Sequence, residues 1–196
     1  MREYIFRGKI RGINKWVEGT GIFFDSINTW LFNHDSTKPV ASGMEKFIVE
    51  PESVGQYTGM NEFMLTDEAR NAKLFEGDIV EVWGWRSVYG RNQSQYDKRV
   101  RARGVIYFGG RGQWLINYDN KYNEELAKLK GSETDKREVH GAYDLYWYGY
   151  HGSDIEAYRA KELEWHGRFH KKEDIVGHND IVKIGTVFEN ADLLEG

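Results

Sequence analysis

The sequence predicts a mainly β fold, a β-rich α+β class built from antiparallel strands. The chain of 196 residues contains seven Trp, twelve Tyr and ten Phe together with 22 Gly and only two Pro, which suits strands joined by tight turns. Short apolar segments begin at turn signals, and helical spacing of apolar residues is confined to one stretch of the chain. A chain of this length buries a full core without disulfides or a structural metal.

The first 50 residues predict an N-terminal β meander. Tyr4 and Phe6 alternate with their neighbours and share one face of a strand. Turn-forming Gly and Asn residues separate this strand from the apolar segments that follow. We expect strands at residues 3–8, 16–24, 30–32 and 47–49.

The centre of the chain carries the clearest turn signal. Gly77 and Asp78 precede the apolar run IVEV, and Gly takes the left-handed backbone that a tight turn needs. A small β-barrel turns its corners in this way. We expect structural turn positions at Gly59, Gly77 and Asp78.

Further strands follow this turn. Residues 79–85 predict one strand, residues 86–99 are polar and predict an exposed loop, and residues 100–108 predict the returning strand. The glycine-rich turn at 109–112 then predicts a hairpin with a strand at 114–118. A strand at 180–190 closes the chain.

Helical patterns appear between these strands. Tyr122, Leu126 and Leu129 recur at helical spacing. Ser153 and Glu156 match a capping box, which predicts a second helix with Ile155, Tyr158, Glu162 and Trp165 near one face. The aromatic run at 143–150 predicts a strand. Its alternating residues favour a core face and a partner contact over a ligand groove.

The composition excludes several classes of protein. The chain has no Cys, which excludes disulfides, thiol catalysis and Cys-based zinc sites. No stretch approaches the roughly 18 apolar residues of a membrane span, and the N-terminus does not match a signal peptide. We expect a cytoplasmic protein without a cofactor. The net charge of −4 argues against a uniformly basic nucleic-acid-binding surface but permits a local basic patch.

One segment, residues 83–103, combines cations with aromatic residues. Residues 86–103 contain six basic residues and a single acidic residue, Asp97. Cations contact phosphates, and aromatic side chains stack on unpaired bases. The ordinary alternative is a solvated hairpin with Arg101 and Arg103 facing water. The candidate nucleic-acid-binding residues are Trp85, Arg86, Arg91, Tyr96, Lys98, Arg99, Arg101 and Arg103.

Other candidate sites favour structural interpretations. His166 and His170 lie four residues apart, but the zinc-hydrolase motif needs Glu between them, so we expect the end of a surface helix and no metal site. Glu76 and Asp78 flank Gly77, and an Asp in such a turn ordinarily bonds to backbone instead of acting in catalysis. The turn at 109–112 lacks the Lys-Ser/Thr of a phosphate-binding loop.

Several ordered blocks resemble the YopX family of phage and prophage proteins. They are REYIFRGK at 2–9, WVEG at 16–19, VGQYTG at 54–59, LFEGDIV at 74–80 and IGTVFENADLL at 184–194. They bracket nearly the whole chain. The chain departs from the shorter family pattern at 60–73 and through a long insertion at 119–172. The family's biochemical role is uncharacterised, so the resemblance supplies no catalytic residue.

The resemblance implies an SH3-like small barrel and a phage or prophage setting in the bacterial cytoplasm. With the residue patterns, it gives three expected parts, listed here by residue: an N-terminal meander at 1–50, a barrel core at 51–118 plus 173–196, and a helix-containing insertion at 119–172.

Two functional hypotheses follow. The first is a non-enzymatic accessory protein that acts by protein–protein association, as a homo-oligomer and with a phage or host protein, because aromatic residues exceed what the barrel buries. The second is a small-barrel nucleic-acid-binding module that uses residues 83–103.

Overall fold

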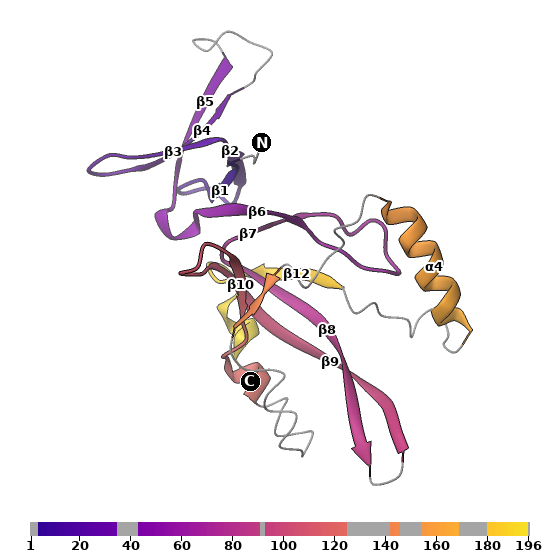
Figure 1. Ribbon diagram of the computed structural model, residues 1–196. Coiled ribbons are helices and arrows are strands. Elements are labelled where there is room, and N and C mark those ends of the chain that lie inside the picture. The colour runs from indigo at the N-terminus through magenta and orange to yellow at the C-terminus, as the bar shows by residue number, and fades with distance from the viewer. Residues whose placement is uncertain are drawn as a thin grey trace. The chain divides into compact units, whose positions relative to one another are not determined.

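The computed structural model describes residues 4–34, 43–90, 93–124, 142–145, 154–168 and 180–195. Every strand pairing among these residues is antiparallel, which confirms the predicted mainly β class (Figure 1). The elements are β1 (Phe6–Lys9), β2 (Trp16–Gly19), β3 (Gly21–Phe24), β4 (Thr29–His34), β5 (Met44–Val49), η1 (Pro51–Ser53), β6 (Gly55–Asn61), β7 (Lys73–Phe75), β8 (Asp78–Gly90), β9 (Gln93–Phe108), β10 (Trp114–Asn117), β11 (Ala142–Asp144), α4 (Ile155–Gly167), β12 (Ile181–Thr186) and η4 (Ala191–Leu194).

The chain divides into two compact units. Unit 1 contains Met1–Met60 and Lys73–Gly77, and unit 2 contains Asn61–Ala72 and Asp78–Gly196. The predicted boundaries at residues 50 and 118 do not coincide with this division, because the chain passes from one unit to the other within residues 60–78.

Unit 1 holds two sheets, with the strand orders β2-β1-β6-β7 and β3-β4-β5. Its fully buried apolar side chains include Leu31, Val49 and Leu74. Each contributes roughly 1.5–3 kcal/mol through burial. Arg7 is also buried, and its guanidinium carbon lies 4.7 Å from the ring centre of Trp16 and 4.6 Å from that of Phe75. Aromatic rings on this cation stabilise a charge that burial alone would penalise.

Two backbone positions in unit 1 depend on glycine. Gly77 lies in a turn, whereas Gly59, which the sequence placed in a turn, lies inside the strand β6. Gly77 has a φ of 79°, the left-handed conformation that the sequence led us to expect, and Gly59 has a φ of 86°. A side chain at either position would strain the backbone. The turn at Gly77 connects β7 with β8.

Unit 2 is built on a sheet with the order β11-β10-β9-β8-β12. Its core includes Ile79, Val80, Ile106, Ile116 and Ile181, all with no exposed surface. The five-stranded order runs from β11 to β12, and no pairing between described strands joins these two edges. The SH3-like barrel therefore stays a prediction.

Two buried carboxylates attach the segment before β7 to β12. Glu62 accepts hydrogen bonds from the backbone N–H groups of Lys183 (2.6 Å) and Ala72 (3.3 Å). Asp180 accepts one from the N–H of Leu65 at 2.8 Å. Phe63 and Ile181 form a β-bridge between these contacts. The two carboxylates therefore accept from backbone N–H groups that have no strand partner here, because the β-bridge is only one residue pair long.

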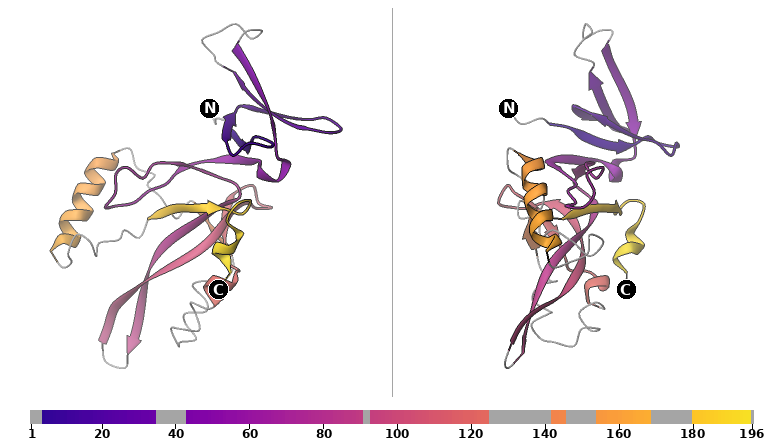
Figure 2. Two further views of the ribbon diagram at one scale, coloured as in Figure 1. Left: turned by 180° about the vertical axis from the view of Figure 1, so that it is seen from behind. Right: turned by 90° about the vertical axis from the view of Figure 1, so that its right-hand side faces the viewer.

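The prediction of an exposed loop at 86–99 was wrong. The strands β8 and β9 continue to Gly90 and from Gln93, so most of this segment is a long two-stranded ribbon (Figures 1 and 2). Polar composition suggested a loop, yet a hairpin strand can be polar on both faces once its partner supplies the backbone hydrogen bonds.

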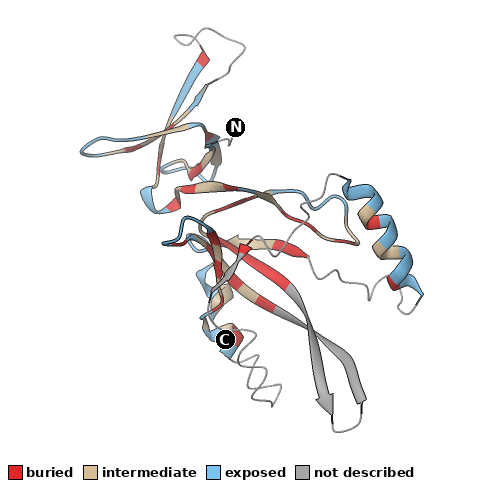
Figure 3. Ribbon diagram, in the orientation of Figure 1, coloured by how far each residue is buried: buried red, intermediate tan, exposed pale blue. Residues whose placement is uncertain are grey.

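The helix α4 differs from its prediction at its start and in its buried face. Its N-cap is Asp154, whose side chain accepts a hydrogen bond from the N–H of Ala157, and not Ser153. Arg159 and His166 are the buried residues, whereas Trp165 is 56% exposed and most of the helix faces solvent (Figure 3).

The buried face of α4 packs on the segment that holds Phe63. The guanidinium of Arg159 lies 5.1 Å from the Phe63 ring centre, and its Nη2 donates to the carbonyl of Met64 at 3.4 Å. The Tyr158 and Phe63 rings lie 6.1 Å apart. Apolar periodicity did not predict this face, because its buried residue is a cation, Arg159, that lies over the Phe63 ring and donates to a carbonyl.

Candidate functional site

The two faces of the three-stranded sheet of unit 1 differ. One is buried in its middle, although Phe24 and Glu45 on its edge strands are exposed, and the other retains exposed apolar groups. Side chains alternate along each strand, so residues opposite one another in the register share a face. Thr29, Leu31 and Val49 are buried on one side. The other side, here called the apolar face, consists of Phe23, Trp30, Phe32, Met44 and Ile48.

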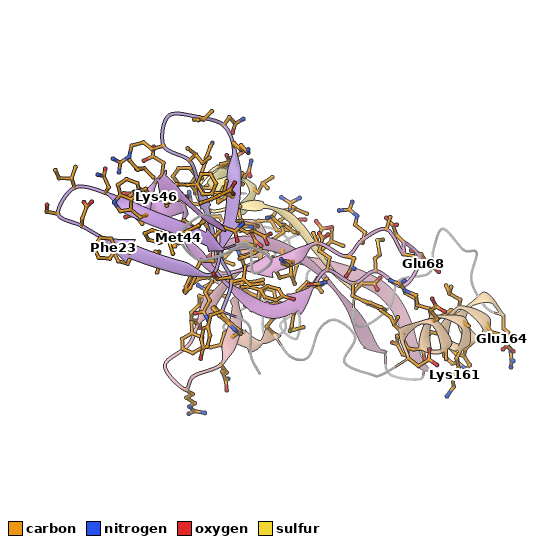
Figure 4. The ribbon with its side chains drawn as sticks, turned by 90° about the horizontal axis from the view of Figure 1, so that it is seen from above. Phe23, Met44, Lys46, Glu68, Lys161 and Glu164 are labelled. Carbon is orange, nitrogen blue, oxygen red and sulfur yellow. The ribbon has the colours of Figure 1, made fainter. Side chains whose placement is uncertain are left out.

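The apolar face retains large exposed groups. Phe23 is 54% exposed and Met44 is 49% exposed, and both lie at the surface of this sheet in Figure 4. Lys46 also belongs to this face, and its ammonium lies 5.5 Å from the ring centre of Trp30. Large apolar side chains exposed on one face of a small sheet make this face a candidate interaction surface.

Asp25 fixes the turn between β3 and β4. Its Oδ1 accepts hydrogen bonds from the backbone N–H groups of Ile27 (2.7 Å) and Asn28 (2.6 Å), and its Oδ2 accepts one from Trp30 Nε1 (2.7 Å). The Trp30 hydrogen bond, followed by the two backbone donors, lowers the pKa of Asp25 from 3.8 to about 2. The carboxylate therefore orients both the hairpin tip and one ring of the apolar face, and Ile27 at that tip is 79% exposed.

The second candidate surface is the ribbon of β8 and β9 in unit 2. In its register Trp83 lies opposite Arg101, Trp85 opposite Arg99, and Glu81 opposite Arg103. Residues directly opposite each other in an antiparallel pair lie on one face. At the base of the ribbon both faces are buried, since Val80 and Val82 and also the intervening Glu81 have little exposed surface. By register, two aromatic positions of β8 therefore lie opposite two cationic positions of β9.

Arg103 already belongs to a network within unit 2. Its Nη1 donates to the carbonyl of Leu193 at 2.9 Å, its Nε lies 3.5 Å from Glu81 Oε2, and its guanidinium carbon lies 3.9 Å from the ring centre of Tyr122. Its side chain is 23% exposed, so it does not simply face water as the hairpin alternative expected. A phosphate would have to compete with these contacts.

Asn123 holds the backbone of the same residue. Its side-chain amide accepts from the N–H of Arg103 at 3.1 Å and donates to the carbonyls of Arg103 (2.7 Å) and Tyr118 (2.8 Å). Asn120 also donates to the Arg103 carbonyl at 2.8 Å. The two side-chain amides therefore supply hydrogen-bond partners for the backbone N–H and C=O of Arg103 at the base of the ribbon. Asn120 and Asn123 are visible in the sequence beside the predicted start of a helix. Their bonds to Arg103 could not be predicted from it, because they depend on tertiary contacts.

The other predicted nucleic-acid-binding residues are placed only by their backbones. Trp85, Arg86, Tyr96, Lys98, Arg99 and Arg101 lie in β8 and β9, and their side chains lie outside the described part of the structure. Arg91 lies outside the described residues altogether.

Asp78 is a structural residue of unit 2. It is fully buried, and its Oδ1 lies 3.0 Å from the ammonium of Lys183 on the neighbouring strand β12. The turn interpretation expected hydrogen bonds to backbone, and the ion pair was not foreseen because Lys183 lies 105 positions further along the chain. Glu76 belongs to unit 1, so the suspected acid pair is divided between the units.

The candidate histidine pair has one described member. His166 is 3% exposed, and its Nε2 lies 3.7 Å from Glu162 Oε2. It is therefore buried and not at a helix surface, while His170 lies outside the described residues. The described residues contain no group of three His, Asp or Glu side chains arranged to hold a metal ion. Of the aromatic run 143–150, only residues 143–145 are described, and Leu145 is fully buried.

Comparison of the chain with protein-family models, with curated proteins and with solved structures finds no significant match. Among the helices that the structure describes, none combines the length and the apolar character needed to cross a bilayer.

Proposed function

We propose that this chain is a non-enzymatic accessory protein of a phage or prophage that acts in the bacterial cytoplasm by associating with copies of itself and with a phage or host protein. The apolar face of unit 1 carries this proposal. Phe23, opposite Trp30, and Met44, on the same face of β5, leave about half of their surfaces exposed, and burying such groups drives association.

The proposed phage or prophage setting and the proposed SH3-like barrel are supported by separate observations. The phage or prophage setting rests on the resemblance of four ordered blocks to the YopX family, the first of which combines residues 2–9 and 16–19. An SH3-like barrel is supported by the consecutive antiparallel strands β8, β9 and β10 and by the return of β12 to β8.

Light scattering during size-exclusion chromatography tests association. We expect the wild-type chain at tens of micromolar to elute at a multiple of 22.9 kDa. A Phe23→Ser/Met44→Ser variant should shift towards 22.9 kDa, because it removes exposed apolar area. Ile27→Ser is the matched control, since Ile27 is 79% exposed but lies at the hairpin tip. A monomeric wild-type chain would contradict self-association.

The ribbon favours a second function, nucleic-acid binding. Its register puts Trp83 and Trp85 opposite Arg101 and Arg99, so residues of the types that stack on bases and bind phosphates occupy opposed backbone positions. The overall charge of −4 opposes binding of a long polyanion, and Arg103 is engaged within the chain.

Fluorescence anisotropy with a labelled single-stranded oligonucleotide tests this second function. We expect measurable binding at low salt that weakens as salt rises, because phosphate contacts release counterions. A Trp83→Ala/Trp85→Ala variant should lose affinity, whereas Ile27→Ser, on unit 1, should bind as the wild type does. Lack of wild-type binding at low salt would exclude this function and leave association intact.

A further inference from the structure

The strand β3 forms an edge of the three-stranded sheet and lacks the usual protection of an edge. Its sequence GIFF contains neither a charge nor a Pro. The opposite edge strand, β5, carries exposed Glu45 and Lys46. Native sheets discourage edge-to-edge pairing by charges and prolines, and β5 therefore follows this rule whereas β3 does not.

The hydrogen-bonding direction along β3 follows from its hairpin. The N–H of Asp25 donates to the carbonyl of Asn28, and Phe23 lies opposite Trp30. Backbone hydrogen bonds alternate in an antiparallel pair, so Phe23 bonds towards β4 while Ile22 and Phe24 direct their N–H and C=O groups away from it. No described strand pairs with β3 on that side.

A second copy of β3 fits this edge in one register. A two-fold axis normal to the sheet can place Ile22 of one copy opposite Phe24 of the other, with a reciprocal pair of hydrogen bonds at each end. Phe23 then lies opposite Phe23 of the other copy, on the apolar face of both. Shifting the pairing by one residue would place the apolar face of one copy against the buried face of the other.

Charge also selects a second copy of β3 over a second copy of β5. In the antiparallel register the two ionised Asp25 side chains lie at opposite ends, about 14 Å apart by strand geometry and beyond the roughly 8 Å screening length. A two-fold pairing of β5 centred on Glu45 or on Lys46 would instead place like charges directly opposite each other, which destabilises a strand pair.

We infer that two copies of this chain pair antiparallel through β3, centred on Phe23, and so join their three-stranded sheets into one continuous sheet. This inference rests on the proposed function of association and names its mode. The apolar face continues across the seam, which buries Phe23 of each copy against the other.

A single introduced cysteine tests the pairing, because the chain contains none. Opposite residues at such a position have Cα atoms about 4.5 Å apart, which a disulfide can span. Under mild oxidation we expect Phe23→Cys to form a covalent dimer at twice 22.9 kDa as the main product. Met44→Cys is the matched control, since Met44 is 49% exposed against 54% for Phe23 and lies on the opposite edge strand, and it should stay largely uncrosslinked.

A second variant keeps the test independent of the cysteine. Phe24→Pro removes an N–H that points away from β4, a position where an edge strand accepts Pro. We expect it to weaken dimerisation at least 10-fold while the circular dichroism spectrum of the monomer is unchanged. Phe24→Ala, which keeps the N–H, should weaken dimerisation less.

The outcomes separate this inference from the proposed function. A wild-type chain that stays monomeric overturns both the pairing and self-association. A wild-type oligomer in which Phe23→Cys crosslinks no better than Met44→Cys overturns the β3 pairing and leaves association standing. Preferential crosslinking at Phe23, together with a weakened Phe24→Pro dimer, supports the pairing.

Discussion

The β3–β4 hairpin of unit 1 and the β8–β9 ribbon of unit 2 are held by polar groups at opposite ends. Asp25 fixes the tip of the first through three hydrogen bonds, and the rest of that hairpin presents apolar side chains. The second is held at its base, where Asp78 contacts Lys183 and Arg103 contacts Glu81. The comparison shows that a hairpin fixed at its tip can offer an uncharged edge, whereas one fixed at its base can extend a charged face.

The base of the ribbon gives the largest expected effect. Lys183→Met removes the ammonium that lies 3.0 Å from the fully buried Asp78 carboxylate. Breaking a buried pair costs roughly 3–5 kcal/mol, and we expect about 3 kcal/mol because Lys183 is 27% exposed. Urea denaturation measures this loss. The double variant Asp78→Asn/Lys183→Met should recover part of it, and full additivity of the two single losses would show that the pair is not coupled.

The turn leading into the ribbon gives the next effect. Gly77→Val should lower the free energy of unfolding by roughly 1–3 kcal/mol, because φ is 79° there and Val tolerates that conformation poorly. Gly110→Val, in the exposed turn before β10, is a control with space for a side chain and no left-handed φ. Equal thermal midpoints for Gly77→Val and the wild type would contradict the strained turn.

The charged face of the ribbon gives a smaller effect, on binding alone. If the ribbon binds a single strand, Arg99→Ala should flatten the logarithmic salt dependence by about 0.7, because one phosphate contact is lost. Trp85→Ala should weaken binding by about 1–3 kcal/mol with little change in that slope. Titrations at several salt concentrations separate the two. Identical slopes for both variants would indicate that Arg99 does not contact phosphate.

The smallest expected effect concerns Asp25 at the tip of the β3–β4 hairpin, and it is measurable only at acidic pH. The pKa of Asp25 is lowered to about 2 in the folded chain, so its stabilising contribution is complete above the ordinary value of 3.8 and is lost as pH falls through about 2. The indole N–H resonance of Trp30 should titrate with this midpoint. In Asp25→Asn that titration should disappear, and a wild-type midpoint near 4 would show that the hydrogen bonds are weak.

The sequence predicted the strand-rich class and several individual elements because local signals agree there. The apolar alternation of residues 79–85 and the glycine turn at 109–112 each lie within a single hairpin, so nearby residues define them. Gly77 was recognisable because the Gly-Asp pair has few conformational roles.

Long-range contacts account for what the sequence did not reveal. The ion pair of Asp78 with Lys183 and the carboxylate contacts of Glu62 and Asp180 join segments more than 100 residues apart. On α4 the charged Arg159 is buried and the apolar Trp165 is exposed. Helical periodicity assumes the opposite, that apolar residues form the buried face. The polar ribbon was mistaken for a loop because its regularity comes from pairing, not from apolar alternation.

The pairing of β8 with a strand near the end of the chain has a consequence for synthesis on the ribosome. The strand β8 pairs with β12, and the paired residues Val80 and Lys183 are 103 positions apart. At roughly 5–20 residues per second, β12 is made about 5–20 s after β8. During that interval the nascent chain displays an apolar strand edge, Ile79 to Val82, with its final neighbour still unmade. A chaperone that binds short apolar strands would therefore act on this edge before residue 181 is translated and not afterwards.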